Sequence, residues 1–230
     1  ARLAAVGQTV SVVMHEVKNI IQLSKFAHDY LARGMERKNE KYIQKGMDGI
    51  KKSLHDMDGF IYEMLSLTKN YKIKPKPFRF QEVVDELHRD LQDKAFHLKV
   101  KLDFKVEEPF GEVYGEQKSI YRAILNIAKN ALEARDRAKE SYLKVHVQST
   151  DEHHYDVIVE DNGSGLSDEV KAKLFQAFFT TKGEQGTGLG LMIIDRTVKA
   201  HHGEVKVDSE FGKWTRFTLS LPKKLAAEED

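Results

Sequence analysis

The chain has 230 residues, 40% hydrophobic and 32% charged, a composition typical of soluble helical proteins. Lysine and arginine total 37 against 36 acidic residues, so the net charge of +1 gives no general attraction to nucleic acid or to membranes. The absence of cysteine excludes disulfide scaffolds, thiol catalysis and cysteine-based metal sites. No apolar run is as long as a membrane span, and no signal peptide is visible. Because the chain begins at Ala1 rather than Met, we interpret it as a fragment of a longer protein. From the charge balance and the lack of a long apolar run we expect this fragment to be cytoplasmic and to contact neither membrane nor nucleic acid, and a membrane anchor elsewhere in the parent protein is compatible with this.

The first part of the chain has a seven-residue apolar repeat that predicts a helical hairpin over residues 1–72. In the first helix, one series is Leu3, Val10, Val17 and Leu31, and the other is Val6, Val13, Ile20 and Ala27. Gly34 and a polar stretch end this pattern, and a second helix follows with the apolar series Ile43, Met47, Ile50, Leu54, Met57, Ile61, Met64, Thr68 and Tyr71. Two helices with narrow apolar stripes bury them poorly alone. We therefore expect a homodimer that forms a four-helix bundle.

A linker with two prolines, Lys72–Pro77, precedes a second domain over residues 73–230. Alternating and helical apolar patterns predict strands at 78–80, 100–106, 143–148, 155–160, 204–209 and 214–221, and helices at 81–95, 117–138 and in a segment ending near 201. The fold class is therefore α+β: a helical hairpin followed by an α/β sandwich.

Asp161 stands at the end of a predicted strand and opens the sequence Asp-Asn-Gly-Ser-Gly-Leu. A carboxylate there can accept a hydrogen bond from an exocyclic amine, while Gly163 and Gly165 let a ring approach the backbone. Further on, Gly186, Thr187, Gly188, Leu189 and Gly190 open a predicted helix, where backbone N–H groups form a cradle for phosphate. The alternative for either cluster alone is an ordinary glycine turn.

Two other segments support the interpretation of these glycine clusters as a nucleotide site. Asn126 and Asn130 lie four residues apart on one face of a predicted helix, and amide oxygens suit a hard cation such as Mg²⁺. The alternative is a pair of polar residues on a solvated face. Between the glycine clusters, residues 175–182 combine three phenylalanines with Thr181 and Lys182, which is typical of an anchor for a mobile lid. Ordinary core packing is the alternative for Phe175 and Phe178.

These four segments resemble, in order and rough spacing, the N, first-glycine, F and second-glycine boxes of the gyrase and histidine-kinase ATPase superfamily. The resemblance covers about residues 77–222. It implies an ATP site in which Asp161 binds the adenine amino group, Asn130 holds Mg²⁺ beside Asn126, and Gly186, Gly188 and Gly190 close a lid over the phosphates. Phe179, Thr181 and Lys182 would belong to this site. The family often has Gly-x-Gly-Thr where this chain has Gly212-Lys213-Trp214-Thr215, and we expect Trp214 at the domain edge.

One histidine differs from the others in context. His15 occupies the outermost heptad position, opposite the apolar seam, with Glu16 beside it and Asn19 one turn later. This resembles the H box of sensor histidine kinases, although Ile20 stands where the family often has proline. We expect the remaining histidines near turns to be solvated, namely His153, His154, His201 and His202.

The resemblance then implies a protein-histidine kinase of a two-component system. His15 would attack ATP with Glu16 as proton acceptor, and the phosphoryl group would pass to an aspartate of a response regulator receiver domain. Asn19 is a candidate for orienting water in the reverse, phosphatase reaction. The alternatives are an ATP-clamp ATPase of the gyrase type and a nucleotide-binding signalling scaffold.

Overall fold

The computed structural model describes residues 2–66, 73–107, 110–136, 139–176, 179–180 and 188–224, and the side chains of residues 2–12, 15, 16, 63 and 66 lie outside this description. The chain divides into two compact units, the first containing residues 1–69 and the second containing residues 70–179 and 188–230. Within the described ranges, no helix is both long and apolar enough to cross a membrane.

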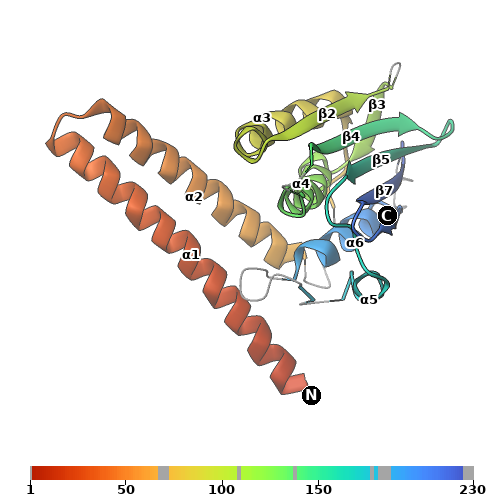
Figure 1. Cartoon of the computed structure of the whole chain (residues 1–230), viewed down its shortest axis with the longest axis horizontal. Helices are drawn as coiled ribbons and strands as arrows, with labels where there is room; N and C mark the ends of the chain where they lie inside the picture. The colour runs from red at the N-terminus through yellow and green to blue at the C-terminus, as the bar shows by residue number, and fades with distance from the viewer. Residues whose placement is uncertain are drawn as a thin grey trace. The chain divides into compact units, whose positions relative to one another are not determined.

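The first unit is an antiparallel helical hairpin, as the seven-residue repeat predicts (Figure 1). Helix α1 spans Arg2–Glu36 and helix α2 spans Glu40–Ser66. In the turn, Lys38 adopts a φ of 51°, and the N–H of Asn39 donates to the carbonyl of Gly34 at 2.8 Å. The side chain of Asn39 accepts from the N–H of Tyr42 at 3.3 Å, which caps the start of α2.

Small residues let the two helices approach closely. A Cβ atom added at Gly46 would lie 2.5 Å from the backbone nitrogen of Leu31, and one added at Gly49 would lie 2.7 Å from the Cβ of Ala27. Neither distance is sterically possible, so these positions require glycine while the helices keep this spacing. The buried Ser53 and Phe60 continue the same seam along α2.

The apolar series of α2 splits into two parts. Ile43, Ile50 and Met57 are half-buried against α1, whereas Met47, Leu54 and Ile61 are 44%, 65% and 49% exposed. On α1, Met14 and Ile21 are likewise exposed, at 61% and 43%. The hairpin therefore leaves an apolar stripe uncovered, which we call the exposed stripe: Met14, Ile21, Met47, Leu54 and Ile61.

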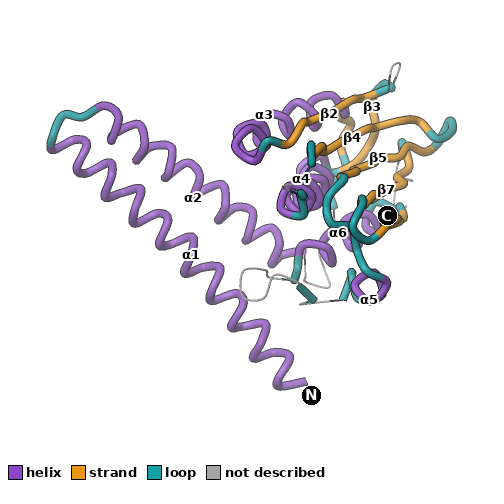
Figure 2. The backbone as a smooth tube through the Cα atoms, viewed as in Figure 1, coloured by secondary structure: helices purple, strands orange, loops and turns teal. Residues whose placement is uncertain are grey.

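The second unit is a mixed five-stranded sheet with helices on one face (Figures 1 and 2). The strand order is β2-β4-β5-β7-β6, and only the β2–β4 pair is parallel. The bounds are Val100–Val106 for β2, Ser141–Ser149 for β4, His154–Asp161 for β5, Glu204–Glu210 for β6 and Trp214–Pro222 for β7. Two further strands, β1 (Lys76–Arg79) and β3 (Glu112–Gly115), form a separate antiparallel pair.

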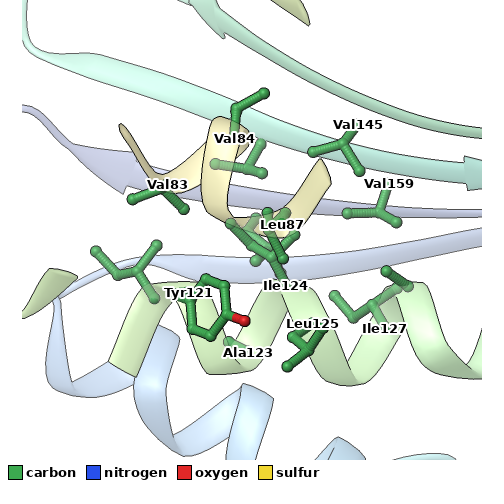
Figure 3. Packing of buried hydrophobic residues seen from close by; sticks show 14 of the residues in the cluster. Val83, Val84, Leu87, Tyr121, Ala123, Ile124, Leu125, Ile127, Val145 and Val159 are labelled. Carbon is green, nitrogen blue, oxygen red and sulfur yellow. The ribbon is translucent and has the colours of Figure 1, made fainter. Parts of the chain in front are cut away.

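Among the described residues of this unit, three helices cover the sheet, and a short fourth lies outside this layer. They are α3 (Phe80–Leu98), α4 (Gln117–Glu133), α6 (Gly190–Ala200) and the one-turn α5 (Asp168–Lys171). Figure 3 shows Leu87 of α3 and Ile124 of α4 near each other in the core, and Val145 and Val159 of the sheet belong to the same cluster. Each buried aliphatic side chain of this kind contributes about 1.5 to 3 kcal/mol to folding.

The opposite face of the sheet carries a row of charges that alternate in sign. Strand register aligns one residue from each of the five strands across the sheet: Asp103, Lys144, Glu160, Arg216 and Asp208. Glu160 lies at the centre of this charge row. It pairs with Arg216 Nη2 at 2.5 Å and with Lys144 Nζ at 3.4 Å, and it accepts from the Tyr142 hydroxyl at 2.9 Å. Burial raises the pKa of Glu160, but the hydrogen bonds from Arg216 and Tyr142 outweigh it and hold the pKa below its ordinary value.

Helices α4 and α5 and strand β3 differ from the sequence prediction, which had no counterpart for the one-turn α5. Helix α4 ends at Glu133 rather than continuing to residue 138, because the carbonyl of Ala134 accepts from the N–H of Ser164 at 2.9 Å instead of continuing the helix. Strand β3 escaped prediction because it has four residues and pairs with β1 far away in the sequence. The other strands begin and end within about two residues of their predicted bounds.

Candidate nucleotide-binding site

Asp161 is the last residue of β5 and its side chain is 6% exposed. Its Oδ1 accepts from the N–H of Gly163 at 2.8 Å. Burial nevertheless dominates and, together with the neighbouring charge of Glu160, raises the pKa of Asp161 to about 6. A buried carboxylate with an acceptor oxygen to spare is suited to a ligand that donates a hydrogen bond to it.

The loop after Asp161 is fixed by backbone contacts on both sides. Asn162 accepts from the N–H of Tyr142 at 2.9 Å and donates to the carbonyl of Glu140 at 2.8 Å, so its amide is committed to the fold. On the other side, the N–H of Leu166 donates to Ser209 Oγ at 2.8 Å and the N–H of Gly212 donates to the carbonyl of Ser164 at 2.7 Å. These contacts hold Asp161 in place before any ligand binds.

The two glycines of this loop have packing reasons of their own. A Cβ atom at Gly163 would collide with the carbonyl oxygen of Ala134, and one at Gly165 would collide with that of Glu210. Gly165 also has a φ of +62°, which disfavours other residues. The fold alone therefore requires both glycines, and ring approach to their backbone stays a prediction.

The start of α6 offers a second set of donors. Gly188 has a φ of +63° and Leu189 is fully buried, which anchors the chain where the helix begins. The N–H groups of the first turn of α6 and the helix dipole favour an anion, and no acidic residue in that turn opposes one. Gly186, Thr187, Thr181 and Lys182, which we assigned to the same site, lie outside the described residues.

The asparagines of α4 lie next to this helix start. A Cβ atom at Gly190 would lie 3.8 Å from Asn126 Nδ2, which is ordinary van der Waals contact. Neither packing nor backbone angle therefore requires glycine here, and the missing side chain leaves space beside Asn126. Asn130 follows one turn later and is half-buried. Phosphate and a hard cation fit this combination of N–H donors, amide oxygens and free space.

The segment before α6 is described only in part. Phe175 is half-buried and packs against the core, as the core-packing alternative holds. The N–H of Phe179, which is half-buried as well, donates to the carbonyl of Gln176 at 3.2 Å. Phe178 lies outside the described residues, so the lid remains a prediction.

His15, Glu16 and Asn19 lie on the continuous helix α1. The side chains of His15 and Glu16 are outside the described residues, whereas Asn19 is exposed and Ile20 is 4% exposed. With Ile20 in place of proline, the helix runs through this segment without interruption.

One sequence-based expectation is wrong. His201 is 1% exposed and is hydrogen-bonded through both ring nitrogens, whereas we expected it to be solvated. Its position indicates why: it lies three residues after Val198 and seven after Ile194, on the buried face of α6. That spacing could have revealed it.

Comparison with known proteins identifies the class of the second unit. Residues 115–225 match the family described as histidine kinase-, DNA gyrase B-, and HSP90-like ATPase. Full-length ShkA in complex with AMPPNP has the same fold, with a TM-score of 0.65 at 20% identity over 90% of this chain and 46% of that chain. The second unit is therefore an ATPase domain of this family.

The similarity extends over both units. Sporulation kinase E of Bacillus subtilis (strain 168) is 29% identical across 99% of this chain and 30% of that protein. The solved complex of histidine kinase ThkA with response regulator protein TrrA has a TM-score of 0.62 at 22% identity, over 100% of this chain and 64% of that one. The chain is thus similar to histidine kinases over both units, and it spans about a third of the length of Sporulation kinases E and A, 30% and 36%.

Proposed function

We propose that this chain is the ATP-dependent autophosphorylating part of a sensor histidine kinase. One observation carries the proposal: a buried carboxylate, Asp161, stands in the same domain as a helix start without acidic residues in its first turn and with space beside Asn126. Asp161 would accept from the adenine amino group through Oδ2, because the N–H of Gly163 occupies Oδ1. The first turn of α6 would hold the phosphates.

Asn130, with Asn126 beside it, would hold Mg²⁺, and Gly186, Thr187, Lys182 and Thr181 would complete the phosphate site. When bound, the cation would neutralise charge on the phosphate oxygens. The chain's own donors at the start of α6 would orient the γ-phosphate and disperse its charge.

His15 would be the nucleophile. A neutral ring nitrogen attacks the γ-phosphorus, so that an N–P bond forms while the bond to the β-phosphate oxygen breaks and ADP leaves. Glu16 would accept the proton from the other ring nitrogen, which stabilises the forming cation. Asn19, exposed one turn later, would orient water for the phosphatase reaction on the partner.

We propose two partners for the first unit. A second copy would cover the exposed stripe and complete a four-helix bundle, since a free hairpin seldom leaves several large apolar side chains uncovered. A response regulator receiver domain would take the phosphoryl group from His15, in line with the ThkA complex that contains a response regulator. We place the division between the phosphotransfer hairpin and the catalytic domain at residue 72.

The test is incubation with Mg²⁺ and γ-labelled ATP. We expect label that is labile in acid and stable in alkali, absent from His15→Ala and strongly reduced in Asn130→Ala and Asp161→Ala. His28→Ala is the matched control, because His28 is an exposed histidine on the same helix and should keep the label. Label in His15→Ala would contradict the proposal. Steady phosphate release without a phosphoprotein would favour the ATP-clamp ATPase, and nucleotide binding without turnover would favour the scaffold.

A further inference from the structure

His201 follows the last residue of α6 and joins two parts of the ATPase domain. Its Nδ1–H group donates to the carbonyl of Thr197 at 2.7 Å, and its Nε2 accepts from the backbone N–H of Glu116 at 2.9 Å. A nitrogen that accepts an N–H carries no proton of its own. The hydrogen-bond network therefore assigns the neutral ring with the proton on Nδ1.

The two hydrogen-bond partners of His201 connect it to the two helices of the nucleotide site. Thr197 lies in α6, and Glu116 adjoins α4. Glu116 directly precedes α4, and its carbonyl accepts from the N–H groups of Ser119 and Ile120, so fixing Glu116 fixes the start of α4. Helix α4 carries Asn126 and Asn130, and α6 begins at the phosphate-binding Gly190. His201 thus ties the start of one helix to the end of the other.

The surroundings of the ring leave it little freedom to move. A Cβ atom at Gly115 would lie 3.1 Å from Cδ2 of His201, so glycine provides the room in which the ring sits against the end of β3. Helices α4 and α6 pack side by side within the domain. The opposite end of α6 lies about 16 Å from His201, and a rigid helix transmits a shift at one end to the other.

We propose that neutral His201 is a positioning residue that sets α6 against α4 and so fixes the start of α6 relative to Asn126 and Asn130. The inference rests on the proposed function, because it assigns His201 to the phosphate half of the ATP site. Asp161 belongs to β5 and is held by contacts that do not involve α6. His201 therefore acts on the binding of phosphate and leaves the binding of adenine unchanged.

Protonation would remove this contact. A proton on Nε2 would turn the acceptor into a donor that faces the Glu116 N–H, and two donors cannot bond to each other. Burial lowers the pKa of His201; the nearby Glu116 carboxylate favours the charged ring and His202 opposes it. The neutral ring thus prevails at neutral pH, and the positioning contact is lost only in acid.

The experiment compares the affinities of the full chain for ADP with Mg²⁺ and for adenosine. In His201→Phe, which keeps an aromatic ring but cannot hydrogen-bond, we expect ADP to bind about tenfold more weakly and adenosine to bind unchanged. His201→Gln can still accept from the Glu116 N–H, and it should recover much of the ADP affinity. In the wild type, the ratio of ADP to adenosine affinity should fall as the pH drops well below the ordinary pKa of histidine, whereas in His201→Gln it should not.

Other outcomes would overturn the inference. A merely structural role predicts a lower melting temperature with the ADP to adenosine ratio unchanged, or equal losses for both ligands. If His201→Phe does not fold, the comparison of wild type with His201→Gln remains. The inference would then be contradicted if the ratio of ADP to adenosine affinity were the same in both proteins across the pH range. A wild type that binds ADP but forms no phosphohistidine would defeat the proposed function and leave this inference standing, whereas a wild type that binds neither ligand would overturn both.

Discussion

At the residue scale, burial of the ionised Asp161 side chain lowers the stability of the ligand-free domain. Its carboxylate is buried at the end of β5 and receives a single hydrogen bond from Gly163. Folding raises its pKa from 3.8 to about 6, so the native chain binds this proton more tightly than the unfolded chain does. The ionised side chain therefore lowers the stability of the ligand-free domain above pH 6, and this loss disappears as the pH falls toward 4.

Asp161→Asn should consequently stabilise the ligand-free protein while weakening nucleotide binding. We expect a higher melting temperature at pH 8, corresponding to at most about 3 kcal/mol, and a difference that shrinks as the pH falls through 6. The amide oxygen would keep the Gly163 bond, so the NH₂ group would face the adenine amine and oppose binding. Thermal unfolding across pH, with and without ADP, measures both effects. A variant less stable than the wild type at pH 8 would contradict the expected cost of the buried charge.

Individual site residues differ in how far the sequence reveals them. Asp161 was predictable, because a carboxylate followed by two glycines at a strand end is an unusual local pattern. The burial of His201 could be read from its spacing on α6, but its hydrogen bond could not, since its partner Glu116 lies 85 residues away and only the packing of α4 on α6 joins them. Asn162 was assigned no separate role, yet both ends of its amide bind backbone groups of the segment at the start of β4.

At the scale of elements, the loop from Asp161 to Leu166 is held between the end of α4 and the β6–β7 hairpin. Gly165 meets the hairpin backbone at Glu210, while Gly212 in the hairpin turn binds the carbonyl of Ser164. Both glycines have positive φ, +62° and +80°, but an added Cβ would meet nothing within 4 Å at Gly212. The pair therefore separates the effect of backbone angle from that of close approach.

Alanine at these two glycines should give unequal losses. Gly212→Ala should cost about 1 to 2 kcal/mol of stability, because only its left-handed angle is disfavoured. Gly165→Ala should cost about 2 kcal/mol more and should also weaken ADP binding, because the loop must move away from Glu210 and take Asp161 with it. Denaturant unfolding and ADP titration measure both. Equal losses in the two variants would show that the contact with Glu210 yields easily.

The limits of prediction for elements have physical causes. The seven-residue repeat predicted both helices of the hairpin, but two apolar series with the same spacing run along α2, and their apolar character alone does not distinguish them. Gly46 and Gly49 decide which series faces α1, since their missing side chains let that face approach closely. The end of α4 depends on the hydrogen bond from the N–H of Ser164 to the carbonyl of Ala134, and these two residues are 30 positions apart in the sequence. Contacts between distant segments, rather than propensity, set these features.

At the scale of the whole molecule, the exposed stripe predicts association. Leu54→Asp should convert the proposed dimer to a monomer, because a second copy would otherwise bury Leu54, which is 65% exposed in the hairpin. The matched control is Lys52→Asp, an exposed position of α2 outside the stripe, which should remain dimeric. Sedimentation equilibrium over a range of concentrations distinguishes the two. A wild type that stays monomeric at all concentrations would refute a role for the stripe in self-association.

The charge row on the sheet bears on how the domain assembles. Strands β5 and β7 alternate apolar and polar residues, so a slip of one residue would bring polar side chains to the core and is strongly opposed. A slip of two residues keeps every apolar side chain on its proper face. Hydrophobic burial alone therefore hardly disfavours the slipped register. Such a slip would set Glu160 opposite Thr218 or Trp214 instead of Arg216, and the central buried charge would lose its partner. The charge row thus disfavours intermediates with a shifted register that hydrophobic burial alone would permit. A chain without Glu160 and Arg216 should therefore refold to a mixture of registers.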